Sequence, residues 1–306
     1  FGFGAGIALS DCNDIGAILA FNMAANNSQA AALALRAGVD WDLQCGTDEA
    51  KWGYGNGYLA QALAEGQVTE ADLDAVVSRV LQQKFSAGLF DAKPTDPTGA
   101  SILDNSAHRA LAREAAAQGI VLLKNSKGAL PTAVAGKNVA LFGQLAQDAT
   151  ATIGSYSLSG AKVTTVADAL TAAGANVQYM PVCSATGAAV CNDTAIAAAK
   201  AVAAKADLAI FVLGDGNGEC GEWGDRDNLD LAGGQLLMLQ GLAGVAPKTV
   251  VVLLHGRPQT FGAQNSVLDQ VDALVSAWRP GEEGGTAVVD ILTGAVNPSG
   301  KLVQSW

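Results

Sequence analysis

The chain has 306 residues, of which half are apolar and only 15% are charged; this composition is typical of a folded protein, excludes a disordered one, and leaves room for two domains. Its 29 acidic and 18 basic residues give a formal net charge of −11 at pH 7, which argues against nucleic acid as a partner. No apolar run approaches the roughly 20 residues of a membrane-spanning helix, so we expect no membrane span.

The apolar run Gly6 to Leu9 ends abruptly in Ser10 and Asp11. Such a run predicts a buried strand that delivers a carboxylate to its carboxyl end. In parallel α/β folds the chemistry is done at that end, because the loops after the strands line the crevice there. Asp11 is therefore the first candidate for a functional residue. The alternative is that Asp11 only caps a helix that starts near Ile15, but a second acidic cluster further along the chain favours the first interpretation.

Three helices and a second strand are predicted in the rest of residues 5 to 91. Gly38 and Gly66 end two of the helices, as C-terminal caps do. The predicted elements are a helix at Phe21 to Ala37, a strand at Val39 to Leu43, a helix at Tyr54 to Glu65 and a helix from Thr69 to about Phe85. Two strands with their helices cannot close a barrel. We therefore expect this part to need partners that it does not contain, and residue 1 to be the cut edge of a longer protein.

Two prolines and a glycine among polar residues indicate a linker at Asp91 to Gly99, because they stop any regular element. The predicted organisation is a first domain at residues 1–93, a linker at 94–107 and a second domain at 108–306. Asp11 belongs to the first domain, and the second acidic cluster belongs to the other.

Strands and helices alternate regularly after the linker. Several of the strands are unbroken apolar runs, which is typical of a parallel sheet covered on both faces. We therefore predict a doubly wound α/β sandwich whose ligand crevice lies at the carboxyl ends of the strands. The predicted strands are Ile120 to Asn125, Asn138 to Phe142, Val177 to Pro181, Leu208 to Leu213, Thr249 to His255 and Ala273 to Trp278, and the predicted helices are Ala110 to Gln118, Val166 to Ala173, Thr194 to Ala204, Gly234 to Ala243 and Glu283 to Thr293.

A charged loop, Glu219 to Arg226, follows one of these strands. The glycines before it are not a dinucleotide fingerprint, because about ten residues separate them from the next helix. Arg226 stands where a calcium loop needs its bidentate acid. His108 and His255 lack the spacing of metal ligands, and Gly154 to Ser157 is not the nucleophile elbow of a serine hydrolase. Two carboxylates, with no metal or cofactor, remain as the expected chemistry.

These two carboxylates, Asp11 and Glu222, suit glycoside hydrolysis. One would attack or stabilise the anomeric carbon, and the other would protonate the leaving oxygen. A retaining enzyme needs the two carboxyl groups about 5 to 5.5 Å apart, with one ionised and the other protonated near the working pH.

A string of motifs, in order along essentially the whole chain, resembles glycoside hydrolase family 3 and in particular its β-xylosidase-like branch. The matching motifs are Ser10-Asp11-Cys12, Leu35-Arg36-Ala37-Gly38-Val39-Asp40, Gly88-Leu89-Phe90-Asp91, Ala112-Arg113-Glu114-Ala115-Ala116, Gly119-Ile120-Val121-Leu122-Leu123-Lys124-Asn125, Gly224-Asp225-Arg226, Leu229-Asp230-Leu231, Pro280-Gly281-Glu282-Glu283-Gly284-Gly285 and Asn297-Pro298-Ser299-Gly300-Lys301-Leu302. By this resemblance Asp11 takes the place of the nucleophile and Glu222 that of the acid/base, with Glu219 in reserve. Trp223 is a candidate for substrate binding. Cys12, where many β-glucosidases of the family have Trp, points to the xylosidase-like branch.

The resemblance also implies a fold and an activity. The fold is the C-terminal part of a (β/α)8 barrel, at residues 1–93, followed by the α/β sandwich. The earlier barrel strands, whose loops normally carry most sugar-binding residues, are absent, so we expect an N-terminally truncated protein whose missing barrel portion is its partner. The implied activity is that of a retaining exo-β-glycosidase, which releases terminal β-xylosyl or β-glucosyl residues from an oligosaccharide or β-glycoside without a cofactor. The truncated chain alone is not expected to be active, and the alternative is a truncated or degenerate relative that acts as a binding or assembly module.

The five cysteines suggest local bridges. Cys183 and Cys191 bracket a short loop and can close a bridge across it. Cys12 and Cys45 follow two apolar segments that would be neighbouring strands, and they form a second candidate pair. Cys220 is then left over.

Two glycosylation motifs place possible glycans on Asn26 and Asn192. Together with the cysteines they favour an oxidising secretory route. We therefore expect a secreted protein, extracellular or in the cell wall.

Overall fold

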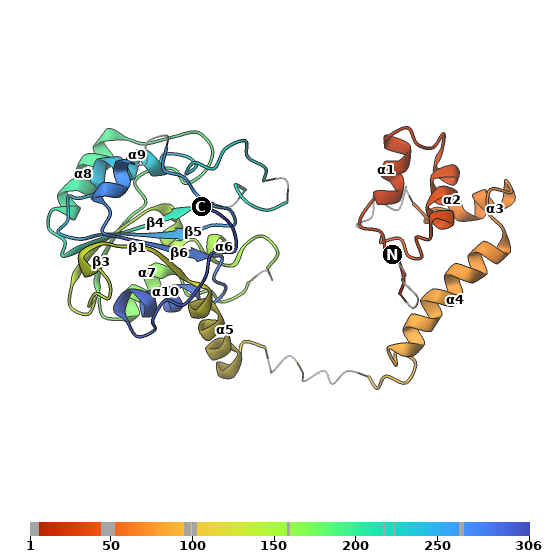
Figure 1. Cartoon of the computed structure of the whole chain (residues 1–306), viewed down its shortest axis with the longest axis horizontal. Coiled ribbons are helices and arrows are strands. Elements are labelled where there is room, and N and C mark those ends of the chain that lie inside the picture. The colour runs from red at the N-terminus through yellow and green to blue at the C-terminus, as the bar shows by residue number, and fades with distance from the viewer. Residues whose placement is uncertain are drawn as a thin grey trace. The chain divides into compact units, whose positions relative to one another are not determined.

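The computed structural model describes residues 6–43, 53–94, 99, 103–157, 160–216, 218–222, 224–262 and 266–306, except for the side chain of Lys127. The chain divides into two compact units, Phe1–Pro97 and Thr98–Trp306 (Figure 1). The identity of the first unit as the end of a barrel stays a prediction.

The first unit holds four helices in its described part. They are α1 (Asp14–Ala20), α2 (Asn27–Ala37), α3 (Tyr58–Ala64) and α4 (Glu70–Ser86). The ends of α2 and α4 follow from the sequence: Gly38 ends α2 with a φ of 93°, and Thr69 opens α4 with a capping box completed by Asp72.

The expected helix at 21–37 is wrong in its first turns. Residues 21–26 form turns and bends, and a new helix begins at Asn27. The reason is that the side chain of Asn26 accepts a hydrogen bond from the backbone N–H of Gln29, which makes Asn26 an N-cap and restarts the helix there.

The two strands expected in this unit are reduced to one parallel bridge, between Leu9 and Trp41, in the residues described. The segments lie side by side, because the N–H of Ser10 donates to the carbonyl of Trp41 and that of Asp40 donates to the carbonyl of Ala8. The predicted pairing of the two segments is therefore correct, but their predicted extent is not. The predicted burial of the first segment is also wrong, because Leu9 is 55% exposed. Asp11 follows directly where the pairing ends.

The second unit is built on a six-stranded sheet with the order β1-β6-β5-β4-β2-β3. Strands β2 to β6 are mutually parallel, as expected, whereas the edge strand β1 runs antiparallel to β6. An apolar run encodes burial but not direction, so the sequence did not reveal this reversal. The strands are β1 (Val121–Asn125), β2 (Asn138–Phe142), β3 (Asn176–Met180), β4 (Leu208–Gly214), β5 (Thr249–Leu254) and β6 (Ala273–Trp278).

Helices cover both faces of this sheet, so the predicted doubly wound sandwich is confirmed. Figure 1 shows α8 and α9 on one face and α7 and α10 on the other. Consecutive residues of a strand are buried on opposite faces: Ile210 packs in the cluster that contains residues of α7 and α10, and Phe211 packs in the cluster that contains residues of α8 and α9. The helices and short helical turns are α5 (Ser106–Gly119), η3 (Ser126–Gly128), η4 (Gln144–Gln147), α6 (Ala149–Ile153), α7 (Val166–Ala172), α8 (Asp193–Ala203), α9 (Gln235–Leu242), η5 (Ser266–Gln270) and α10 (Gly284–Thr293).

The core of this unit is apolar throughout its central strands. Each side chain of β4 and β5 is fully or almost fully buried, and burying a Leu, Ile, Val or Phe side chain contributes roughly 1.5 to 3 kcal/mol relative to leaving it exposed. In the part of the chain that the structure describes, none of the helices has the length and apolar character needed to cross a membrane.

Candidate active site

The acidic loop of the second unit leaves the sheet at the carboxyl end of β4. The chain steps outward from β2 to β3 and then returns to β4 on the other side of β2, and ligands of open α/β sheets bind at such a reversal. Gly214, the last residue of β4, has a φ of 133°, and a Cβ there would lie 2.0 Å from the carbonyl oxygen of Leu254. Only glycine allows this close exit.

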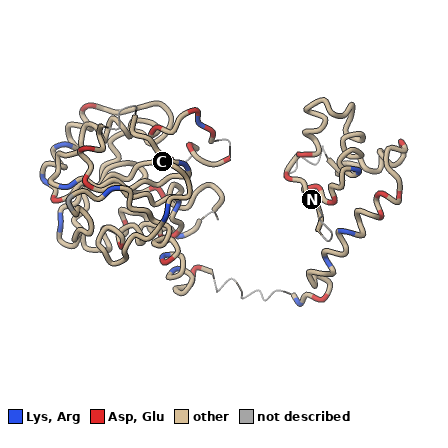
Figure 2. Tube along the Cα trace, viewed as in Figure 1, with Lys and Arg blue, Asp and Glu red and all other residues tan. Residues whose placement is uncertain are grey.

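Glu222 sits on a tight turn of this loop. The N–H of Gly224 donates to the carbonyl of Gly221 at 3.0 Å, which closes a four-residue turn with Glu222 at its second position. The Glu222 side chain is exposed, and its Oε2 accepts a hydrogen bond of 2.5 Å from the hydroxyl of Tyr156. Figure 2 shows acidic and basic residues gathered along this loop.

Glu219 is held quite differently. Its Oε1 accepts a hydrogen bond of 2.6 Å from the N–H of Gly187, and its Oε2 lies 3.7 Å from Nε of Arg226. The side chains of Glu219 and Arg226 are only 16% and 14% exposed. Both carboxylate oxygens of Glu219 are thus engaged in joining parts of the protein.

Trp223, the candidate substrate-binding residue, lies outside the residues that the structure describes. Its role stays a prediction.

Asp11 is exposed in the first unit, directly after the paired segment. Its Oδ1 accepts a hydrogen bond of 2.7 Å from the N–H of Cys12, and its own N–H donates to Asp14 at 2.9 Å. The alternative in which Asp11 caps the first helix is wrong, because Asn13 occupies the N-cap of α1 and no side-chain cap bond is made there.

A polar network supports the segment that carries Asp11. The hydroxyl of Ser10 donates to Asp42 at 3.1 Å, and the other oxygen of Asp42 accepts the N–H of Tyr54 at 2.8 Å. Burial, together with the charges of Asp42 and Asp40, raises the pKa of the Tyr54 phenol above its ordinary range. Tyr54 therefore stays neutral, and its hydroxyl donates to the carbonyl of Val39 at 2.6 Å.

Asp11 and Glu222 belong to different compact units of the chain. Their meeting across a cleft therefore stays a prediction. Within the described residues no group of three or more His, Cys, Asp and Glu side chains is arranged to hold a metal ion.

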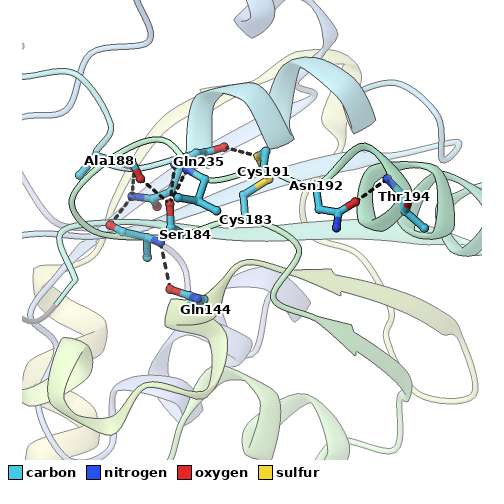
Figure 3. The surroundings of a disulfide bond; sticks show 12 residues. Gln144, Cys183, Ser184, Ala188, Cys191, Asn192, Thr194 and Gln235 are labelled. Carbon is cyan, nitrogen blue, oxygen red and sulfur yellow. Dashed lines mark hydrogen bonds between the residues drawn. A yellow bond between two sulfur atoms is a disulfide. The ribbon is translucent and has the colours of Figure 1, made fainter.

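The cysteines follow the expected pattern where the structure describes them. The sulfur atoms of Cys183 and Cys191 lie at disulfide-bonding distance, with their Cα atoms 4.6 Å apart (Figure 3). Cys12 is disulfide-bonded, while its expected partner Cys45 lies outside the described residues. Cys220 has a free thiol.

Tyr156 is a partner of the candidate residue Glu222 that the sequence patterns did not single out. Tyr156 comes shortly after α6 and not at the end of a strand, so the strand-end patterns used to find Asp11 and Glu222 do not point to it. The hydrogen bond from Tyr156 to Glu222 joins residues that are 66 positions apart in the sequence, so no local pattern predicts it.

Residues 120–306 match the family model described as the glycosyl hydrolase family 3 C-terminal domain. The chain belongs to glycoside hydrolase family 3. The resemblance seen in the motifs is therefore confirmed.

Relatives of this family 3 chain are named for β-xylosidase and β-glucosidase activity. The β-xylosidase of Formosa agariphila is 30% identical over 313 residues, which cover 98% of this chain and 42% of that protein. The periplasmic β-glucosidase of Salmonella typhimurium is 31% identical over 333 residues, with the same two coverages.

Solved structures of the family agree. The β-glucosidase from Listeria innocua in complex with isofagomine superposes with a TM-score of 0.81 at 26% identity, over 96% of this chain and 40% of that one. An exo-β-xylosidase of family 3 in complex with a xylobiose aziridine probe gives 0.80 at 28% identity, over 96% of this chain and 37% of that one. This chain thus spans about two fifths of the length of the relatives it matches.

Proposed function

We propose that the protein is a retaining exo-β-glycosidase that releases terminal β-xylosyl or β-glucosyl residues, with Asp11 as nucleophile and Glu222 as general acid and then general base. Membership of family 3 and the names of its relatives support the reaction class. The observation that carries the assignment in this chain is the exposed carboxylate of Glu222, held by Tyr156 on a turn at the carboxyl edge of the sheet.

The reaction would run in two displacements. The Asp11 carboxylate attacks the anomeric carbon while the Glu222 carboxylic acid gives its proton to the leaving oxygen, which departs as an alcohol. Glu222, now ionised, removes a proton from water, and this water displaces Asp11 with net retention. The proposal requires the two carboxyl groups to come within about 5 to 5.5 Å of each other.

Glu222 is preferred to Glu219 because a general acid must reach a substrate oxygen. One carboxylate oxygen of Glu219 accepts the N–H of Gly187 and the other pairs with Arg226, and the side chain is largely buried. Glu222 accepts a hydrogen bond from the Tyr156 hydroxyl through one oxygen only, and its side chain is exposed to solvent.

A fluorinated glycoside with an activated leaving group tests the nucleophile. It traps the glycosyl-enzyme, because the 2-fluoro group slows both displacements while the activated leaving group restores only the first. The expected result is a label on the peptide that contains Asp11 and no label in Asp11→Asn. A label on another carboxylate in an active preparation would overturn the assignment.

A non-catalytic binding or assembly module is the second candidate, and the observation that favours it is the coverage of only about two fifths of the relatives. We expect activity to require the earlier barrel strands that the family resemblance implies. Binding of xylobiose without turnover, unchanged in Asp11→Asn and Glu222→Ala, would support the module.

We also propose that the protein is exported to an oxidising compartment. The pair Cys183 and Cys191 supports this, as does the printed name of the periplasmic Salmonella relative. Of the two glycosylation motifs, Asn192 is the better acceptor: Thr194 is exposed, whereas Ser28, which completes the motif of Asn26, is 1% exposed and bonded to Glu65.

A further inference from the structure

We propose that Arg257 is a positioning residue that fixes the loop carrying Glu222, an inference that rests on the proposed role of Glu222 as acid/base. The guanidinium Nη2 of Arg257 donates to two backbone carbonyls, that of Glu219 at 2.5 Å and that of Gly224 at 2.8 Å. These carbonyls stand on either side of Glu222 in the chain. One nitrogen therefore draws the two ends of the segment together and leaves Glu222 at its tip.

Arg257 is itself held by the buried carboxylate of Asp215. Its Nε lies 3.8 Å from Oδ2 of Asp215, which is completely buried. Asp215 is oriented by the N–H of Gly256 at 3.0 Å and by the side-chain amide of Gln259 at 3.1 Å. Asp215 directly follows β4, and Arg257 comes shortly after β5. The contacts that hold the acidic loop are therefore anchored to two central strands of the sheet.

The same segment packs closely against the loop of Arg257 and against the segment that contains Ser155. A Cβ on Gly256 would lie 2.2 Å from Sγ of Cys220, so the loop packs on bare backbone there. Gly221 has a φ of 135°, and a Cβ on it would lie 2.6 Å from Oγ of Ser155. These close contacts restrict sideways movement of the segment, and the two hydrogen bonds from Arg257 hold its ends.

Such precision matters because proton donation requires the acid within hydrogen-bond reach of the leaving oxygen, and a misplacement of about 1 Å can cost on the order of 10²-fold in rate. Only the planar, multiply donating guanidinium can serve two carbonyls and a carboxylate at once. A lysine would keep the charge beside Asp215 but would not reproduce this geometry.

The test compares Arg257→Lys with Glu222→Ala and with a matched control, Arg113→Lys. Arg113 pairs bidentately with Asp290, between α5 and α10 and away from the loop. Each variant of the active protein is assayed with a dinitrophenyl glycoside, whose leaving group needs no acid, and with xylobiose or cellobiose, whose leaving group does. For Arg257→Lys we expect kcat/KM to fall roughly 10- to 100-fold for the disaccharide and less than about 3-fold for the aryl glycoside. Arg113→Lys should change both substrates alike.

Amide hydrogen exchange supplies a readout that does not depend on turnover. The N–H of Gly224 should exchange faster in Arg257→Lys than in the parent or in Arg113→Lys, because its bond to Gly221 loses its support. Equal slowing of both substrates, or unchanged exchange at Gly224, would overturn the proposal. If instead Glu222→Ala shows no preference for the activated substrate, the proposed acid fails, and the exchange result alone decides whether Arg257 clamps the loop.

Discussion

The hydroxyl of Tyr156 donates a hydrogen bond of 2.5 Å to Oε2 of Glu222. Tyr156 lies between α6 and α7, in the connection from β2 to β3, and Glu222 lies in the loop after β4; β2 and β4 are neighbours in the sheet. Tyr156 is 82% exposed, so it contributes little to the core. The bond gives Glu222 one preferred orientation and is made through only one of its two carboxylate oxygens.

Removing this hydroxyl should weaken acid assistance without unfolding the protein. We expect Tyr156→Phe to lower kcat/KM for a disaccharide about 5- to 30-fold, since a hydrogen bond to a carboxylate contributes roughly 1 to 2 kcal/mol, and to leave a dinitrophenyl glycoside nearly unchanged. Tyr179→Phe, on β3 and away from the acidic loop, is the control. A loss equal for both substrates would show that Tyr156 does not act through Glu222.

Substitutions of the two glutamates of the loop, Glu219 and Glu222, should affect activity in different ways. Glu222→Ala removes the proposed acid, so substrates with poor leaving groups should be slowed far more than activated aryl glycosides. Glu219→Gln keeps an acceptor for Gly187 but loses the ion pair with Arg226, so it should slow all substrates to a similar, smaller extent. Comparison of kcat/KM across aryl glycosides of graded leaving-group pKa separates the two. The opposite pattern would move the acid/base role to Glu219.

Local patterns predicted much of this fold and both carboxylates of the proposed site. The bounds of β2 and β6 agree with their apolar runs, and Asp11 stands where a strand-ending carboxylate was expected. The direction of β1 could not be predicted, because the apolar pattern of a strand indicates its burial but not the direction in which it runs. The partners of Glu222 could not be predicted either: the bonds from Tyr156 and from Arg257 to this loop span 66 and 38 residues, and their donors are ordinary loop residues until the sheet brings them together.

Acid should destabilise the second unit through His255. This side chain is fully buried, against the rings of Trp278 and Trp306, with Nε2 2.8 Å from the hydroxyl of Ser276. Burial lowers the pKa of His255 from 6.5 to about 4, opposed by the nearby charge of Asp215 and assisted by that of Arg279.

The sign follows from proton uptake. Below pH 6.5 the unfolded chain protonates this imidazole before the folded protein does, so the free energy of unfolding falls as the pH drops from about 6.5 through 4, by up to about 3 kcal/mol. Urea unfolding at several pH values should show a shallower dependence in His255→Gln than in the parent. His108→Gln is the control, because His108 is the other of the two histidines and is exposed. Parallel curves for the parent and His255→Gln would contradict the prediction.

Opening the bridge between Cys183 and Cys191 should disturb the acidic loop as well as the fold. The residues are eight positions apart, and a closed loop of this length restricts the unfolded chain by roughly 2 to 3 kcal/mol. The loop between them holds Gly187, whose N–H donates to Glu219, and Ser184, whose carbonyl accepts the N–H of Gly234. The double variant Cys183→Ala/Cys191→Ala should therefore unfold at lower urea concentration, and its amides at 184–190 should exchange faster than those of β4. Cys220→Ala serves as the control for loss of a thiol. Unchanged exchange at Gly187 in the double variant would show that the hydrogen-bonded contacts alone hold this loop in place.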